Sequence, residues 1–433
     1  MKEIAQRIFR KTLAAIDARA ALARKITRDG TRIRAGNSIV DLREFDDIVA
    51  IAFGKAAFAM AQGLGEILPA EKVIDGILVV PSVPDRDLRG WTAFTGGHPT
   101  PNQQSFEAGR AILELLFRCT DRTLIFFLIS GGGSALVEQP LEPEVSLEDF
   151  QHLNSVLVTC GAPIEEINVV RKHLSAIKGG RLAAAAPQAM KLTFAISDVP
   201  EGQESALASG PTLPDPSTIA ETEKIINRHH LIEKLPPSIR RIVDERRLHE
   251  TPKESDPAFA RSRFELLLGE HELLHAAHHA CEAEGLVCLC DRAPDNWPLE
   301  KAVDHLLRVL AAHKKANPHR PVAVLADGEV ISPVSGDGIG GRNSAFVLAC
   351  VSKIAGKKIT VLSAGTDGID GNSPAAGAIA DGESLTRATA AGLDPADFLR
   401  RSDAYSFFAC LGDAIVTGPT GNNLRDLRIL LAE

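Results

Sequence analysis

A run of six consecutive apolar residues, 124–129, constrains the fold of this chain more than any other stretch. Such a run is typical of a strand buried on both faces in a parallel sheet covered by helices. It leads directly into two serines that flank three glycines: Ser130, Gly131, Gly132, Gly133 and Ser134. Glycines there let the backbone approach a ligand with φ > 0, and their N–H groups can cradle an anion. Because ligands of open α/β sheets bind beyond the carboxyl ends of strands, we expect a ligand here; a glycine-rich turn without one is the alternative.

Strands and helices alternate along the first half of the chain. Strands are predicted at residues 48–53, 73–80, 124–129 and 192–196. A helix is predicted at about residues 103–117, with Thr100 or Asn102 able to cap it, and a further helix carries residues 168–183. This alternation indicates an α/β fold with a mostly parallel, doubly wound sheet.

A charged stretch with several prolines, about residues 214–257, separates this part from a second α/β run. Strands of the second run are predicted near residues 264–268, 286–289, 322–325, 359–362 and 414–417. The predicted organisation is therefore two α/β domains, residues 1–240 and residues 258–433.

Composition limits the possible partners and compartments. Of the 433 residues, 45% are hydrophobic and 24% charged, which is ordinary for a soluble globular protein. A formal charge of −8 argues against binding to nucleic acid or to an anionic membrane. No apolar run reaches membrane-spanning length, the amphipathic segment 1–17 lacks the apolar core of a signal peptide, and the seven cysteines include no CxxC pair. We expect a cytoplasmic protein with no nucleic-acid or membrane partner.

Lys55 follows the strand 48–53 and Gly54, at the predicted first turn of a helix. The helix dipole disfavours a cation there unless an anion binds beside it. The P-loop pattern is not met, because it would need glycine at Val49 and serine or threonine at Ala56. Lys55 is thus a candidate phosphate-binding cation on a different loop, with a solvated surface lysine as the alternative.

Arg342, like Lys55, is a cation at the predicted start of a helix. The glycine-rich segment 336–341, which ends in Gly340 and Gly341, leads into an apolar helix through Arg342 and Asn343. The segment also fits GxGxxG formally. That dinucleotide fingerprint is weak here, because the preceding strand ends about ten residues earlier and no suitable acid follows. A phosphate-binding loop with an arginine clamp is the better interpretation.

Carboxylates lie at or just beyond the ends of several predicted strands: Asp198, Asp367 and Asp370, with Glu329 as a further candidate. Such hard oxygen ligands near phosphate loops suit Mg²⁺-nucleotide chemistry, although single aspartates in turns are commonly capping residues. Asp198, Asp367 and Glu329 are the predicted metal ligands. A formal HExxH zinc motif, His271 to His275, is interpreted as a chance match on a structural helix.

With these segments in place, the chain resembles the class II glycerate 2-kinase family, whose members have often been labelled hydroxypyruvate reductase and carry a MOFRL domain. The resemblance covers nearly the whole chain, in order. It rests on GKAA at 54–57, GHPTPN at 97–102, SGGGSAL at 130–136, NVVRKHLSAIKGGRLA at 168–183, ISDV at 196–199, ASGPTLPDPST at 208–218, GGRN at 340–343, SAGTDGIDG at 363–371 and TGPTGNN at 417–423.

The resemblance implies a Rossmann-like N-terminal domain, a MOFRL-like α/β domain and an active site in the cleft between them. It also implies ATP with Mg²⁺ as phosphoryl donor, and Lys55 and Arg342 as the catalytic cations. The matching motifs supply the expected substrate- and nucleotide-binding residues: Gly54, Ser130, Gly131, Gly132, Gly133, Ser134, Arg171, Lys178, Gly340, Gly341, Asn343 and Asn422. The protein is expected to be a monomer or a homodimer.

Three segments depart from the family pattern. Residues 326–329 read ADGE where the family usually has SGGE, GGRNQEF becomes GGRNSAF, and TGPTGTN becomes TGPTGNN. The expected activity is ATP-dependent phosphorylation of D-glycerate to 2-phosphoglycerate. The alternatives are an NAD(P)H-dependent hydroxypyruvate reductase and a non-catalytic sensor of a phosphorylated or carboxylated metabolite.

Overall fold

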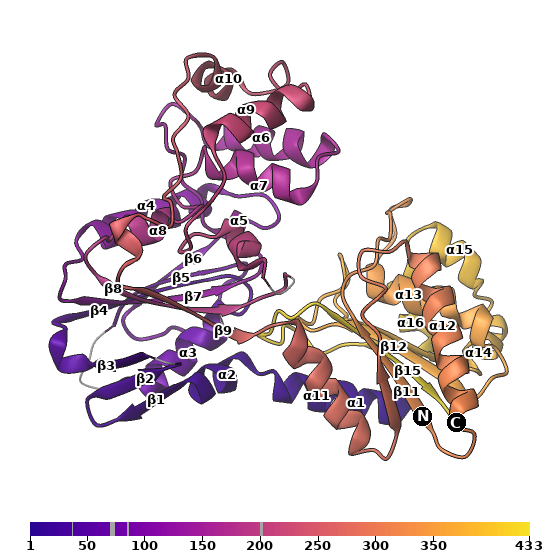
Figure 1. Ribbon diagram of the computed structural model, residues 1–433. Coiled ribbons are helices and arrows are strands. Elements are labelled where there is room, and N and C mark those ends of the chain that lie inside the picture. Colours follow the sequence, from indigo (N-terminus) through magenta and orange to yellow (C-terminus); the bar gives the residue numbers. More distant parts are fainter. Residues whose placement is uncertain (37, 70–73, 85, 200–201) are drawn as a thin grey trace. The chain divides into compact units, whose positions relative to one another are not determined.

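The chain forms two compact units in the computed structural model, which describes residues 1–36, 38–69, 74–84, 86–199 and 202–433. One unit comprises Ala18–Leu267, and the other comprises Met1–Asp17 together with Leu268–Glu433. Figure 1 shows that strands and helices alternate in both. The division into domains 1–240 and 258–433 stays a prediction.

A six-stranded sheet organises the first unit, in the order β6-β5-β4-β7-β8-β9. Its strands are β4 (Asp47–Phe53), β5 (Ile74–Val80), β6 (Trp91–Thr95), β7 (Thr123–Ser130), β8 (Met190–Ile196) and β9 (Ser262–Leu268). The pairs from β6 to β8 are parallel, and all eight residues of β7 are buried, as an unbroken apolar run requires. The predicted parallel sheet is confirmed. Val73, with which one predicted strand begins, lies outside the described residues.

Helices cover both faces of this sheet. Figure 1 shows α3 (Ala57–Ile67) on one face and α4 (Gln103–Phe117) on the other. The predicted bounds of α4 are confirmed, and its cap is Asn102, whose Oδ1 accepts a hydrogen bond from the Ser105 N–H at 2.9 Å. The helix predicted over residues 168–183 is wrong as one element. It divides into α7 (Ile164–Lys172) and α8 (Arg181–Ala184): the helix ends at Lys172, and Gly179 and Gly180, with φ values of +59° and +84°, directly precede α8.

Two smaller assemblies complete the first unit. Four helices pack around an apolar cluster of their own: α6 (Leu147–Thr159), α7, α9 (Ile219–Arg228) and α10 (Pro237–Asp244). After α2 (Ala18–Lys25), the chain forms an antiparallel sheet of β1 (Ile26–Asp29), β2 (Arg32–Ala35) and β3 (Ser38–Asp41).

The second unit holds another six-stranded sheet, in the order β10-β11-β15-β12-β13-β14. Its strands are β10 (Val287–Cys290), β11 (Val322–Asp327), β12 (Ile359–Gly365), β13 (Gly377–Asp381), β14 (Ala414–Ile415) and β15 (Asp426–Ala432). Only the pair β10–β11 is parallel, so this sheet is mixed. The terminal strand β15 lies between β11 and β12 and runs antiparallel to both, and all seven of its residues are buried.

Three sequence expectations for this region need correction. Residues 264–268 do not open the second sheet, because they belong to β9 at the edge of the first. The strand predicted at 414–417 ends at Ile415, and β13 and β15 were not predicted. Both missed strands pair antiparallel: β13 follows β12 with no helix between them, and β15 pairs with two strands that are distant in sequence. Alternation of strands and helices along the sequence therefore does not reveal them.

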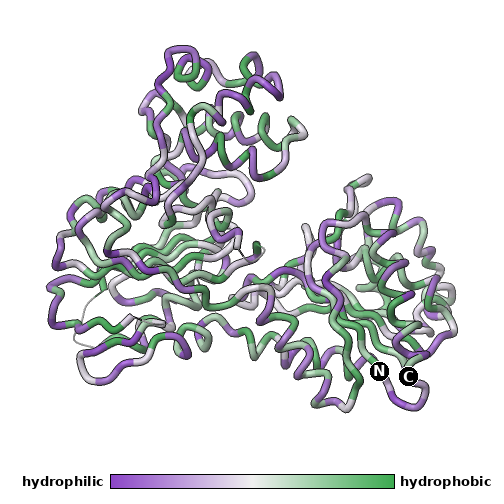
Figure 2. Tube along the Cα trace, in the orientation of Figure 1, coloured by the Kyte–Doolittle hydropathy of each residue, from purple (hydrophilic) through white to green (hydrophobic). Residues whose placement is uncertain are grey.

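Helices also cover both faces of the second sheet (Figure 1). The first helix, α1 (Lys2–Ala15), packs with α11 (Glu270–Glu282) on one face. The other face carries α12 (Leu299–Ala316), α13 (Arg342–Ile354), α14 (Ser384–Ala390), α15 (Pro395–Arg400) and α16 (Ala404–Leu411). Figure 2 shows the apolar residues concentrated along the strands of both sheets. Among the described helices, none is both long and apolar enough to cross a membrane.

The central position of β15 predicts that removing it unfolds the second unit. A chain that ends at Arg425 leaves β11 and β12 without their shared neighbour and removes seven buried residues. That loss should exceed the roughly 5–15 kcal/mol by which a typical domain is stable. We expect rapid cleavage within residues 268–425 in limited proteolysis. A chain lacking only the exposed Glu433 is the control, and equal protease resistance of the two would contradict the prediction.

Candidate active site

The loops that follow β4 and β7 meet at the carboxyl edge of the first sheet. The register pairs Phe53 with Ile129, so the residues after each strand are neighbours. The Lys55 N–H donates to the Gly131 carbonyl at 3.1 Å, and the Ala56 N–H donates to Ser130 Oγ at 2.9 Å. Lys55 precedes the N-cap residue Ala56, so it lies just before α3 and not in its first turn.

Glycine is required where these loops touch. Gly54 has a φ of +118°, and a Cβ placed on it would lie 2.2 Å from Ser130 Oγ. Gly132 has a φ of +83° and caps the short helix α5 (Gly133–Leu136). A Cβ on Gly132 would lie 3.3 Å from Nε2 of His98 and 3.5 Å from Cγ of Lys55. The side chains of Lys55 and His98 therefore border the glycine loop. His98 was not predicted as a site residue, although it lies in the GHPTPN motif.

Behind the glycine loop lies a buried polar network. Ser134 Oγ is 2.9 Å from Ser209 Oγ, and the Lys178 ammonium donates to the Ser134 carbonyl at 2.9 Å. Lys178 also forms an ion pair with the Glu138 carboxylate, which accepts a further hydrogen bond from Ser175. Burial outweighs the attraction of Glu138 and lowers the pKa of Lys178. The ion pair holds the Lys178 ammonium in the position from which it donates to Ser134, the last residue of the glycine loop.

Two further predicted site residues, Arg171 and Asp198, lie on different elements: Arg171 on α7, and Asp198 after β8. The Arg171 Nε donates to Asn154 Oδ1 at 2.9 Å, and burial lowers the pKa of the guanidinium. Asp198 follows β8 at the same edge of the sheet as the glycine loop, because the register pairs Ser130 with Ile196. The structure thus gathers Lys55, the glycine loop and Asp198 at one edge.

In the second unit, Arg342 is the first residue of α13, as the sequence predicts. Its Nε donates to Asp426 Oδ2 at 2.5 Å, and its Nη2 lies 2.7 Å from Glu329 Oε1. Burial lowers the pKa of Arg342, but the carboxylates of Asp426 and Glu329 outweigh that effect, so the net pKa is raised above its usual value. Arg342 is therefore permanently charged and held by two acids.

Asp370 and Asn343 stabilise the start of α13. The Asp370 carboxylate accepts hydrogen bonds from the N–H groups of Asn343 and Ser344, at 2.9 and 2.8 Å, and from Ser344 Oγ at 2.6 Å. The Asn343 Oδ1 accepts from Ser363 Oγ at 2.6 Å, deep in the unit. Burial raises the pKa of Asp370. Asp370 thus acts as a helix cap, the alternative that the sequence left open.

The edge where β15 begins gathers further charged residues. The Arg428 side chain is fully buried and donates to the carbonyls of Asp327 and Gly328, at 3.1 and 3.0 Å. A Cβ on Gly365 would lie 3.0 Å from an Asp367 oxygen and 3.5 Å from an Asp426 oxygen, so both carboxylates border that glycine. Asp426 and Arg428 were not predicted, because no motif marks them and only the fold brings β15 beside Arg342.

Gly340 and Asn422 have structural partners. The Gly340 N–H donates to Asn372 Oδ1 at 2.8 Å. Asn422 is buried; its N–H donates to Thr420 Oγ1 at 3.1 Å and its Nδ2 to the Leu13 carbonyl at 3.4 Å. The loop from Asp327 to Arg342 is long, whereas a dinucleotide fingerprint needs a tight turn between strand and helix.

Of the predicted metal ligands, Asp198 belongs to the first unit, and Asp367 and Glu329 belong to the second. Within the part of the chain that the structure describes, no three His, Cys, Asp or Glu side chains are grouped so that they could hold a metal ion. Glu329 pairs with Arg342, and Asp367 Oδ1 accepts from the Ile369 N–H at 3.0 Å. In the HExxH segment, Glu272 accepts from the Gly269 N–H at the start of α11.

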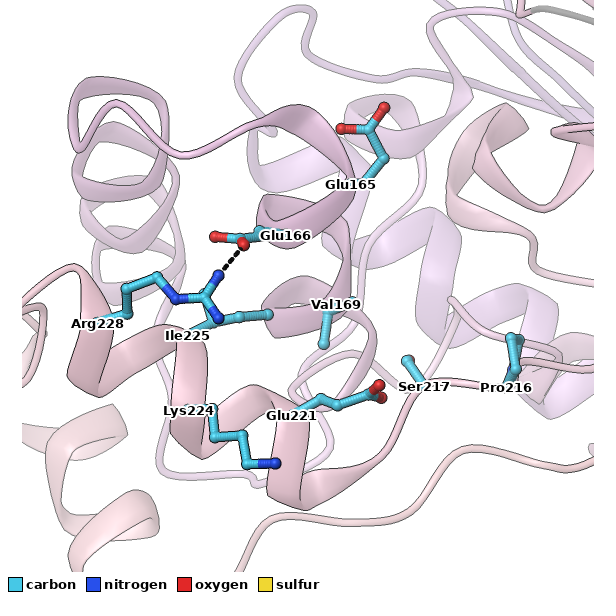
Figure 3. A pocket seen from close by; sticks show the side chains of 9 residues that line it. All are labelled: Glu165, Glu166, Val169, Pro216, Ser217, Glu221, Lys224, Ile225 and Arg228. Atoms are coloured by element: carbon cyan, nitrogen blue, oxygen red, sulfur yellow. Dashed lines mark hydrogen bonds and ion pairs between the residues drawn. The ribbon is translucent and has the colours of Figure 1, made fainter.

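A separate pocket of about 360 Å³ opens beside α7 and α9 (Figure 3). Its wall includes the ion pair between Glu166 and Arg228, and none of its lining residues belongs to the predicted site. The pocket is a feature of the helical part of the first unit.

Two family profiles match the chain: Domain of unknown function (DUF4147) at residues 4–244, and MOFRL family at residues 322–426. A D-glycerate 2-kinase from Thermotoga maritima is 34% identical over 400 residues, covering 92% of this chain and 93% of that protein. A protein from Agrobacterium vitis named putative hydroxypyruvate reductase is 34% identical over 99% of this chain and 94% of its own length.

The crystal structure of a glycerate kinase from Thermotoga maritima has the same fold, with a TM-score of 0.83 and 31% identity over 100% of this chain and 99% of that one. This chain belongs to the glycerate 2-kinase family that combines the DUF4147 and MOFRL regions. The resemblance drawn from the sequence motifs is thereby confirmed, and a kinase of this family implies ATP as a ligand.

The contact between Gly54 and Ser130 predicts that Gly54→Ala displaces the glycine loop. The added Cβ overlaps Ser130, and alanine rarely adopts a φ of +118°. We expect a loss of more than about 1 kcal/mol in unfolding free energy, together with reduced activity. Gly65→Ala, in the helix α3 that follows this loop, is the matched control, because a Cβ there meets nothing within 4 Å. Equal melting temperatures and rates for the two variants would rule out the steric constraint.

The buried ion pair predicts a large cost for Lys178→Met. This change leaves the Glu138 carboxylate buried and without its cation, which typically costs about 3–5 kcal/mol. Adding Glu138→Gln should restore part of that loss in urea-unfolding experiments. Lys353→Met serves as control, because its pair with Asp304 is exposed and worth about 0–1 kcal/mol. A Lys178→Met protein as stable as the control would show that the ion pair does not support the loop.

Proposed function

We propose that this protein transfers the γ-phosphoryl group of ATP to the 2-hydroxyl of D-glycerate and releases 2-phosphoglycerate and ADP. The proposal rests on one observation: the Arg342 guanidinium is permanently charged and is held by Asp426 at the start of a helix. Membership in the glycerate 2-kinase family supports it, as does the name of the 34% identical relative from Thermotoga maritima. Phosphoryl transfer places spreading negative charge on the transferred group, and fixed cations stabilise that charge.

The glycine loop, the two cations and the metal each have a separate role in the proposed reaction. The loop from Ser130 to Ser134 binds a phosphate or the glycerate carboxylate through its N–H groups, with Lys55 at its border. Arg342 contacts the phosphoryl group in transit. Mg²⁺ is proposed to arrive with ATP, because this ion is commonly held by substrate phosphates and waters with only one or two carboxylates. The assignment of Asp198, Asp367 and Glu329 to that metal stays a prediction.

The proposal predicts that Lys55→Ala and Arg342→Ala each lower kcat for ADP formation with D-glycerate about a hundredfold or more, while the proteins remain folded. Lys353→Ala is the control cation, because Lys353 lies in the last turn of α13, the helix that Arg342 begins, and pairs with Asp304 at the surface. Rates come from a coupled ADP assay and folding from circular dichroism. Near-normal turnover in either variant would remove that residue from the mechanism, and oxidation of NAD(P)H with hydroxypyruvate would favour the reductase.

A further inference from the structure

Arg342 has two carboxylate partners that differ in accessibility. Asp426 holds the Nε at 2.5 Å, and its side chain is only 4% exposed. Glu329 lies 2.7 Å from Nη2, and its side chain is 43% exposed, similar to the 38% of Arg342. One carboxylate is thus an inner anchor, and the other faces solvent on the open side of the guanidinium.

The inner anchor is itself fixed by the fold. Asp426 is the first residue of β15 and pairs in register with Gly365 of β12. Its carboxylate lies 4.0 Å from the buried Arg428 guanidinium, which adds a second cation beside it. Asp426 is therefore almost completely shielded from water and keeps the Arg342 guanidinium in one place.

The contact between Glu329 and Arg342 can break without movement of the backbone. The Glu329 backbone is fixed on both sides, because its N–H donates to Asp295 Oδ1 at 2.9 Å and its carbonyl accepts from the Asn296 N–H at 2.7 Å. Release of Arg342 by Glu329 then requires only a rotation of the Glu329 side chain. The Arg342 side chain is partly exposed, so a phosphoryl or carboxylate oxygen that reaches the guanidinium competes with Glu329 for its N–H donors.

We propose that Glu329 is a displaceable competitor of the anionic substrate: its carboxylate pairs with Arg342 until the substrate takes its place, while Asp426 holds the guanidinium throughout. This inference rests on the proposed function, in which Arg342 contacts the anionic substrate. The competitor weakens the binding of every ligand that has to displace it from Arg342. An exposed ion pair of this kind is worth little, so it should weaken anion binding only about two- to fivefold.

The experiment compares Glu329→Gln with Asp426→Asn by steady-state kinetics with D-glycerate and Mg²⁺-ATP. Glu329→Gln should lower KM for one of the two substrates about two- to fivefold. If Glu329 instead holds Mg²⁺, the same variant should lower kcat and raise KM for Mg²⁺-ATP, which would overturn the inference. Asp426→Asn should lower kcat without lowering KM, because Arg342 loses its anchor. Glu300→Gln is the control for net charge, since Glu300 lies on α12 and its exposed carboxylate is 3.8 Å from the Lys353 ammonium; it should change neither constant.

Calorimetric titration with inorganic phosphate tests the competitor even if D-glycerate is not turned over. Glu329→Gln should bind phosphate about two- to fivefold more tightly than the parent protein, and this gain should disappear when Arg342→Ala is added. Equal or weaker phosphate binding by Glu329→Gln would overturn the inference, and so would a gain that persists without Arg342. If the protein does not turn over D-glycerate but Glu329→Gln still binds phosphate more tightly through Arg342, only the proposed substrate is overturned.

Discussion

The parallel pairing of β4 with β7 is the contact on which the position of the glycine loop and of Lys55 in the first unit depends. Their register aligns Phe53 with Ile129, so the loops that follow the two strands meet. Gly54 fits against Ser130 because it has no side chain. A slip of one residue would turn every side chain of the strand to the opposite face of the sheet. The glycines and Lys55 are thus placed by strands that are buried along nearly their whole length.

In the second unit, antiparallel pairing of the strand β15 places the charged residues around Arg342. The last strand of the chain enters the middle of a mixed sheet and brings Asp426 and Arg428 to the edge where β11 and β12 end. Asp426 then anchors Arg342, whose helix is capped separately by Asp370. A cation at a helix start is unfavourable by itself, and here two carboxylates and a capping aspartate offset that cost.

Much of this arrangement could be predicted from the sequence, and the remainder could not for identifiable reasons. Apolar runs revealed the strands β4, β5, β7 and β8 of the first sheet but not its edge strand β6, which is only partly buried. Glycine-rich segments after strands revealed the loops of Lys55 and Arg342. Asp426 escaped prediction, because its position follows from antiparallel pairing with distant strands and no local pattern marks it. Lys178 matched a family motif, yet burial and the Glu138 carboxylate give it a structural ion pair that sequence spacing does not reveal.

Phosphorus NMR of the purified protein with Mg²⁺-ATP and D-glycerate tests the central claim most directly, because the spectrum separates 2-phosphoglycerate from 3-phosphoglycerate and reports ADP in the same sample. The account predicts that 2-phosphoglycerate and ADP appear together in equal amounts, and that both form about a hundredfold or more slowly with the Arg342→Ala protein. Formation of 3-phosphoglycerate, or ATP that stays intact in the presence of D-glycerate, would contradict it.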